Sequence, residues 1–121
     1  KLIHLVPPAT PPERAAQIAR SSTGFLYVVS VTGITGERAL LPPEIIEQLH
    51  RLRGQASVPL CVGFGISKPD HVKMLREAAD GIIVGSALVR RLEQIGPRHL
   101  DDVVREIGDL TQSLAGALNT G

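Results

Sequence analysis

Several residue types are scarce in this sequence, and each scarcity excludes a class of protein. Cys61 is the single cysteine among 121 residues, which excludes a disulfide framework and a cysteine-cluster metal site. Only 2% of the residues are aromatic, contributed by Phe25, Tyr27 and Phe64, too few for the stacking platforms that bind single-stranded nucleic acid. The 13 Lys and Arg against 12 Asp and Glu lack the basic excess of a nucleic-acid-binding module.

Long apolar runs are also absent. No run approaches the roughly 20 residues that cross a bilayer, and we expect no signal peptide. With 43% hydrophobic and 21% charged residues, the composition argues against disorder. We therefore expect residues 1–121 to form a single soluble, cytoplasmic unit. Because Leu2 already lies in an apolar run, we also expect further sequence upstream.

Short apolar runs rich in β-branched residues alternate with segments of helical period. Runs of this kind suit strands that are covered on both faces of a parallel sheet. The expected strands are Leu2–Val6, Phe25–Ser30, Val58–Gly63 and Gly81–Gly85.

Each expected strand is followed by a predicted helix. Thr10 and Ser67 are predicted N-caps, because each precedes proline and an acidic residue. Further helices are expected from Leu41, directly after Ser86, and from Leu100 to Leu118. Four strand–helix repeats predict either a small open α/β sheet or four of the eight repeats of a (β/α)₈ barrel.

Glycines follow three of the expected strands. Because the carboxyl ends of parallel strands meet at one edge, Gly36, Gly65 and Gly85 are expected near a common ligand. Ser86 begins a predicted helix, where unpaired N–H groups favour an anion. A single glycine is as well explained by a tight turn, but the three loops together predict a phosphate site.

Three longer segments resemble the alpha subunit of tryptophan synthase. They are FLYVVSVTGITG at 25–36, PLCVGFGISKPDHV at 59–72 and DGIIVGSALV at 80–89, with Pro7-Pro8 after the first strand. The resemblance extends over essentially the whole chain. It implies that the chain supplies strands five to eight, with their helices, of a (β/α)₈ TIM barrel.

The resemblance also implies an activity and a set of site residues. The family cleaves indole-3-glycerol phosphate in a retro-aldol reaction of tryptophan biosynthesis, giving indole and glyceraldehyde 3-phosphate. The implied supporting residues of catalysis are Tyr27 and Thr35. The implied phosphate-binding residues are Gly36, Gly65, Gly85 and Ser86. The implied indole pocket consists of Leu5, Val29, Phe64 and Ile83.

The family's two catalytic carboxylates have no counterpart in this chain. Glu37 matches no catalytic position, and Glu13, Glu44 and Asp70 are explained as residues of helix first turns. Because the reaction needs one proton delivered and another removed, we expect the isolated segment to be inactive.

The resemblance implies the tryptophan synthase beta subunit as a partner, in a heterotetramer. Pyridoxal phosphate would belong to that partner, so we expect no cofactor in this chain. Its four histidines lack metal-ligand spacing, so we expect no metal either. Because a half-barrel leaves strand edges unpaired, we expect order only with the missing half of the barrel or with a second copy.

Two alternatives remain open. One is another phosphate-binding barrel enzyme, such as an indole-glycerol-phosphate synthase or a phosphosugar isomerase. The other is a non-catalytic half-barrel that binds a phosphorylated ligand or serves in assembly.

Overall fold

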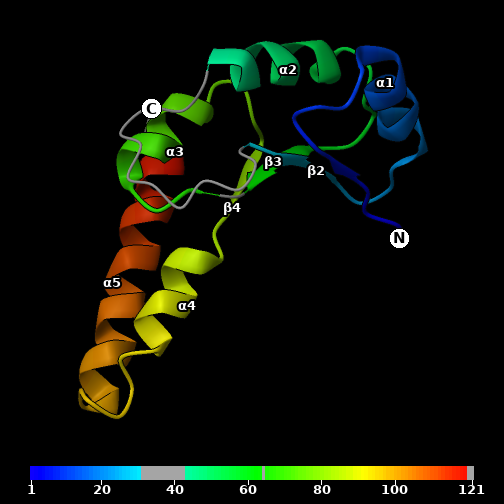
Figure 1. Cartoon of the computed structure of the whole chain (residues 1–121). Helices are drawn as coiled ribbons and strands as arrows, with labels where there is room; N and C mark the ends of the chain where they lie inside the picture. The colour runs from blue at the N-terminus through cyan, green and yellow to red at the C-terminus, as the bar shows by residue number, and fades with distance from the viewer. Residues whose placement is uncertain (31–42, 64, 120–121) are drawn as a thin grey trace.

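The computed structural model describes residues 1–30, 43–63 and 65–119, and the chain alternates strands with helices (Figure 1). The predicted site residues Thr35, Gly36 and Phe64 lie outside this part of the chain. The strands are β1 (Leu5–Val6), β2 (Leu26–Val29), β3 (Leu60–Gly63) and β4 (Gly81–Ile83). The helices are α1 (Pro12–Ser21), α2 (Pro43–Arg53), α3 (Pro69–Leu75), α4 (Ser86–Leu92) and α5 (Leu100–Asn119).

The four strands form one parallel sheet in the order β1-β2-β3-β4. Each strand therefore lies beside the next one along the chain, as in a (β/α)₈ barrel, and the chain has the fold of part of such a barrel. Among the described residues, β1 pairs with β2 alone and β4 with β3 alone. Of the helices that the structure describes, none is long and apolar enough to cross a membrane.

One face of the sheet carries the hydrophobic core. Side chains alternate across a strand, and every second residue of the first three strands is fully buried against the helices. These strand residues are Val6, Leu26, Val28, Leu60 and Val62. Residues of the covering helices complete the core: Ala15, Ala19, Ile45, Leu49, Leu52, Val72, Leu75, Leu114 and Ala117. We call this the helix face.

The opposite face, which we call the inner face, is only partly covered. Leu5 is 55% exposed, and Tyr27, Val29 and Ile83 are half-buried. Within the described residues, the expected cover on both faces of the strands is complete on the helix face alone. Cys61, expected to be buried, is also half-buried, because its side chain projects from this face.

Several predicted boundaries differ from the structure. The first strand is confined to Leu5–Val6, and the last ends at Ile83 rather than Gly85. The N-cap of α1 is Pro11 rather than Thr10, because Thr10 N–H closes a turn onto the Pro7 carbonyl at 3.1 Å.

The cap of α3 also differs from the prediction. Its N-cap is Lys68 rather than Ser67, and it makes no side-chain capping hydrogen bond. The backbone N–H of Ser67 instead donates to Nδ1 of the buried His71 at 3.3 Å. A histidine in the first turn of α3 therefore orders the chain before the helix.

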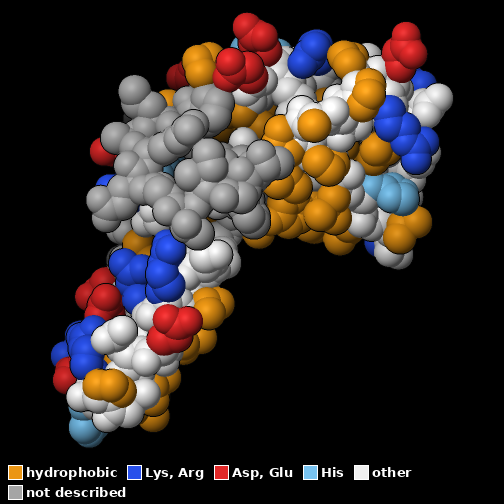
Figure 2. Space-filling model, in the orientation of Figure 1, with side chains coloured by type: hydrophobic (Ala, Val, Ile, Leu, Met, Phe, Trp, Pro, Cys, Tyr) orange, Lys and Arg blue, Asp and Glu red, His pale blue; other side chains and the backbone are white. Residues whose placement is uncertain are grey.

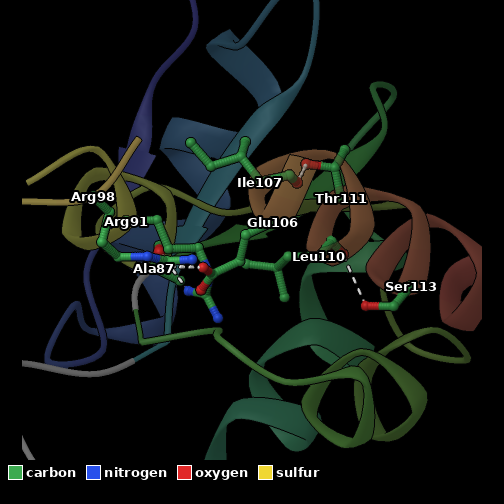
Figure 3. A network of polar contacts seen from close by, with 8 residues as sticks. All are labelled: Ala87, Arg91, Arg98, Glu106, Ile107, Leu110, Thr111 and Ser113. Atoms are coloured by element: carbon green, nitrogen blue, oxygen red, sulfur yellow. Dashed lines mark hydrogen bonds and ion pairs between the residues drawn. The ribbon is translucent and has the colours of Figure 1, made fainter. Parts of the chain in front are cut away.

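Helices α4 and α5 lie side by side and project from the sheet (Figure 1). We call this pair the α4–α5 stem. Arg91 of α4 and Arg98 of the connecting turn converge on the Glu106 carboxylate of α5 (Figure 3). Arg91 Nε lies 3.3 Å from Glu106 Oε1, and Arg91 Nη1 donates to the Ala87 carbonyl at 2.7 Å. The hydrogen bond from Arg98 and the charges of both guanidinium groups hold the pKa of Glu106 below its usual range.

Candidate functional site

The inner face of the sheet is built in two layers that follow the strand register. Leu5, Tyr27, Cys61 and Gly81 stand beside one another across the four strands. The next layer toward the carboxyl ends is formed by Val29, Gly63 and Ile83. The predicted residues Leu5, Tyr27, Val29 and Ile83 therefore lie on one face of the sheet. A predominantly apolar wall of this kind suits a flat apolar ligand.

Tyr27 lies across the glycine of the neighbouring strand. A Cβ added at Gly63 would stand 2.6 Å from Tyr27 Cζ, much closer than real Cβ contacts allow. Tyr27 is in register with Cys61, whereas Gly63 is two residues further toward the carboxyl end. The phenol ring therefore leans diagonally along the sheet, and its hydroxyl reaches the carboxyl-end layer.

Cys61 and Gly81 repeat this pairing of a side chain with a glycine. A Cβ at Gly81 would stand 2.9 Å from Cys61 Sγ. Burial, with a smaller contribution from the negative charge of Asp80, raises the pKa of the Cys61 thiol. The thiol is accordingly protonated at neutral pH and is a poor nucleophile.

Asp80 organises the amino end of the sheet. Its Oδ2 accepts a hydrogen bond from Leu60 N–H at 2.9 Å, and its Oδ1 lies 3.3 Å from Arg53 Nη1. Arg53 also donates to the Ala78 carbonyl at 2.8 Å. Asp80 is thus engaged in joining α2, β3 and the start of β4, at the end of the sheet opposite the predicted site.

Ser30 ties together the carboxyl ends of β2 and β3. Its backbone N–H and its hydroxyl both donate to the Gly63 carbonyl, at 3.0 and 2.9 Å, and the residue is buried. These bonds hold the end of β2 against β3 at the point where residues 31–42 begin.

The two described glycines of the predicted phosphate site occupy equivalent positions after neighbouring strands. Gly63 and Ile83 are in register, and Gly65 and Gly85 each follow them by two residues. Gly65 has a φ of +80°, a conformation that favours glycine. Gly85 and Ser86 are exposed, and a Cβ at Gly85 would meet nothing within 4 Å.

Ser86 begins helix α4. The Gly85 carbonyl accepts hydrogen bonds from Leu88 N–H at 2.9 Å and from Val89 N–H at 3.1 Å. The N–H groups of Ser86 and Ala87 belong to the first turn and have no acceptor within the helix. These first-turn donors lie directly after Gly85, where the sequence predicts part of a phosphate site.

The pairing of glycines with larger side chains was missed in the sequence. Gly63 and Gly81 provide space for the side chains of Tyr27 and Cys61. A glycine inside an apolar strand is the sequence pattern that could have indicated such a close approach. The sequence likewise predicts Ser30 only as the end of a strand, without its hydrogen bonds to Gly63.

The inner-face strand positions that the structure describes are uncharged. Across residues 1–30, 43–63 and 65–119, the strand positions of the inner face carry no carboxylate. The same part of the chain holds no group of three or more His, Cys, Asp or Glu that could bind a metal ion.

A hollow of about 120 Å³ lies elsewhere, between α1 and α2. It is lined by Ala15, Gln48, Arg51 and Leu52, among others, and is separate from the predicted site.

Comparison with known proteins gives a consistent result along the whole chain. The family model described as tryptophan synthase alpha chain matches residues 1–118. The tryptophan synthase alpha chain of Rhodopirellula baltica is 44% identical over 125 residues, covering 98% of this chain and 45% of the relative. That of Methanocaldococcus jannaschii is 50% identical over 101 residues, covering 84% of this chain and 34% of the relative.

Solved structures agree with the sequence relatives. A Mycobacterium tuberculosis tryptophan synthase structure gives a TM-score of 0.78 at 33% identity, covering 98% of this chain and 42% of the other. A mutant tryptophan synthase alpha-subunit from Pyrococcus furiosus gives 0.76 at 34% identity, covering 94% of this chain and 44% of the other. The chain spans less than half the length of these relatives.

Proposed function

Because this chain belongs to the tryptophan synthase alpha chain family, we propose that it supplies the phosphate-binding edge and one wall of the indole pocket of a carbon–carbon lyase. The lyase would cleave indole-3-glycerol phosphate to indole and glyceraldehyde 3-phosphate. The observation that carries the proposal is the common inner face of Leu5, Tyr27, Val29 and Ile83, which leads to Gly65 and Gly85 at the carboxyl edge.

The phosphate would be held by backbone donors rather than by a lysine. The N–H groups around Gly65, Gly85 and Ser86, with the Ser86 hydroxyl, are the donors that the described residues offer. Such N–H groups suit an anion, because an unpaired donor at a helix start gains a strong acceptor. Gly36 remains a proposed fourth residue of this site, on the strength of the family resemblance.

The indole would lie along the inner face. Leu5, Val29 and Ile83 provide aliphatic contacts, and Phe64 is proposed to complete the pocket. The Tyr27 hydroxyl, which reaches the carboxyl-end layer beside Gly63, would stand near the reacting glycerol carbons. Thr35, which follows β2 in the sequence, is proposed to support a catalytic carboxylate that lies outside this chain.

The chemical step needs an acid and a base, and the inner-face strand positions of the described residues carry no carboxylate. The bond between the indole ring and the glycerol chain breaks, its electron pair remains on the ring carbon, and that carbon takes up a proton. The adjacent hydroxyl loses its proton and becomes the aldehyde oxygen. A general acid and a general base must perform these transfers. We propose that both come from outside this chain's 121 residues, so that the segment alone releases no indole above the buffer background.

The partner that we propose is the tryptophan synthase beta subunit, in a cytoplasmic heterotetramer. Pyridoxal phosphate would be bound by that partner, and no cofactor or metal is proposed for this chain. The support is membership of the family, together with similarity to solved structures that are named as tryptophan synthase. The family match favours this function over the synthase and isomerase alternatives and over a non-catalytic half-barrel.

Titration with glycerol 3-phosphate tests the phosphate site. In two-dimensional ¹H–¹⁵N spectra of the chain, we expect saturable shifts of the amides of Gly65, Gly85 and Ser86. Gly85→Asp should weaken binding about tenfold or more, because a like charge at about 4 Å costs roughly 1–4 kcal/mol. Gly108→Asp is the matched control, since its Cβ also meets nothing within 4 Å but lies on α5.

Two results would contradict the proposed site. One is a set of shifts that avoids the carboxyl edge of β3 and β4. The other is equal weakening by Gly85→Asp and Gly108→Asp, which would mean that the ligand responds to net charge alone.

A further inference from the structure

His71 is a buried polar residue that the proposed function leaves without a role. Histidine side chains are visible at the surface in Figure 2, and of the other three histidines, His50 and His99 are exposed and His4 is half-buried. His71, by contrast, is only 4% exposed. It is the third residue of α3, the helix that follows the loop carrying Gly65. Because buried polar groups are almost always hydrogen-bonded, the partners of this ring indicate what it does.

The histidine closes the turn that precedes its own helix. Its Nδ1 accepts a hydrogen bond from Ser67 N–H at 3.3 Å, and its backbone N–H donates to the Lys68 carbonyl at 3.1 Å. Because a backbone N–H can only donate, Nδ1 must be the unprotonated nitrogen of the ring. In a capping box, a Glu or Gln at this third position accepts from the N–H of the N-cap residue. His71 bonds one residue earlier than that, so it holds the loop before the helix.

The three residues from Gly65 to Ser67 are each held by a different feature. Gly65 has a φ of +80°, Ile66 is 3% exposed and belongs to the hydrophobic core, and Ser67 N–H is bound by His71. Together these features define the path by which the chain leaves β3 and enters α3. Because glycine is the most permissive residue of the backbone, the direction of the chain at Gly65 depends on the residues after it being fixed.

We propose that His71 is a positioning residue of the phosphate site. By holding Ser67 N–H, it fixes the backbone directly after Gly65 and thereby directs the N–H groups around Gly65 toward the anion. The inference rests on the proposed function, because it concerns the same site. A site made of backbone donors depends on such control, since donors that are already in place need no further ordering when the ligand binds.

A neutral ring suits this position better than the carboxylate of a capping box. A buried carboxylate here would add a negative charge to the turn that follows Gly65, where it would repel the anion. The carboxylate of the same helical turn, Asp70, is 84% exposed in its side chain and lies 3.9 Å from Lys73 Nζ, so solvent and the lysine screen its charge. His71 therefore supplies an acceptor for Ser67 N–H without adding a charge.

The hydrogen bond itself can be tested in the full chain without ligand or substitution. In ¹⁵N spectra of the ring, we expect the neutral histidine to carry its proton on Nε2. The Ser67 amide proton should exchange with solvent faster in His71→Leu than in the unaltered chain. His71→Asn should restore slow exchange, because its Oδ1 can take the place of Nδ1 in a side chain shaped like that of leucine. A ring proton on Nδ1, or equal exchange in all three proteins, would overturn the inference.

Titration with glycerol 3-phosphate connects this hydrogen bond to the site. His71→Leu should weaken binding by about two- to tenfold, the effect of one hydrogen bond, whereas His71→Asn should retain the affinity of the unaltered chain. Val72→Ala is the matched control, because Val72 is 1% exposed in the same helix. It should lower the free energy of unfolding, measured in urea, but leave the acceptor for Ser67 N–H in place and the affinity unchanged.

The outcomes separate this inference from the proposed function. An unaltered chain without saturable binding would overturn the proposed function and the inference with it. Saturable binding that shifts the amides of Gly85 and Ser86, and that His71→Leu leaves equally tight, would overturn the inference alone. Weakening by Val72→Ala as strong as that by His71→Leu, or the absence of rescue by His71→Asn, would also overturn it, because His71 would then act through the stability of the fold.

Discussion

The effect of Gly63→Ala on the free energy of unfolding should depend on the residue at position 27. The substitution should destabilise the chain beside Tyr27 and stabilise it beside an alanine. The ring of Tyr27 occupies the place where a Gly63 Cβ would be, with Cζ at 2.6 Å and Cε1 at 2.9 Å from it. The alanine must therefore displace the ring, which is half-buried and can move toward the open inner face.

The magnitude follows from two opposing effects. Overpacking of this kind costs about 1–3 kcal/mol, and the half-exposed ring places the cost near the lower end. Replacing glycine in a strand also removes backbone freedom from the unfolded chain, which stabilises by about 0.4–1 kcal/mol. The difference of the two predicts that Gly63→Ala destabilises by about 0.5 kcal/mol when Tyr27 is present. In a Tyr27→Ala background the clash is gone, and the same substitution should stabilise by about 0.5 kcal/mol.

Urea unfolding of the four proteins of this cycle measures the effect. All must be measured at one chain concentration, since association would otherwise alter the apparent stability. Gly108→Ala is the control, because its Cβ meets nothing within 4 Å and it lies in helix α5. It should stabilise by up to about 1 kcal/mol in both backgrounds. A Gly63→Ala effect of the same size and sign with and without Tyr27 would refute the packing that we derive.

Three further predictions concern the ion pairs and the thiol. Glu106→Gln should reduce the free energy of unfolding at neutral pH. Because the pKa of Glu106 in the folded chain lies below 4.5, the advantage of the unaltered chain should disappear as the pH falls through that lowered value. Urea unfolding of both proteins from pH 7 to 3 measures this. Equal stability of both proteins at every pH would contradict this. Asp80→Ala should cost about 1–2 kcal/mol, because Leu60 N–H loses a charged acceptor, whereas Asp80→Asn, which keeps an oxygen there, should cost less; equal costs would show that the Arg53 ion pair, which both substitutions remove, dominates. The thiol of Cys61 should react more slowly with iodoacetamide in the folded chain than in urea at pH 8, since burial raises its pKa; equal rates would mean that the inner face is open to the reagent.

The chain order of the fold could be predicted from local patterns. Apolar runs near Leu26, Leu60 and Ile82 marked strands, and prolines at Pro12, Pro43 and Pro69 marked the starts of helices. These signals are local, because hydrophobic period and the fixed φ of proline act within a few residues. The cap residues Thr10 and Ser67 were predicted wrongly, since turns made with Pro7 and His71 compete with side-chain capping.

Much of the candidate site could also be predicted. Period-two alternation places Tyr27 and Val29 on one face of β2, and Gly65 and Gly85 follow two paired strands by the same interval. Thr35, Gly36 and Phe64 lie outside the described residues, and their roles remain predictions.

The sequence by itself determined which segments become strands and helices, in which order, and that glycines follow the strands. Only the tertiary structure decided which face of the sheet is covered, because both alternating sets, Leu26 and Val28 as well as Tyr27 and Val29, are largely apolar. It also decided that Tyr27 leans over Gly63, and that Glu106 joins Arg91 to Arg98. These contacts join residues on different elements, and their geometry depends on how the elements pack, which no local pattern encodes.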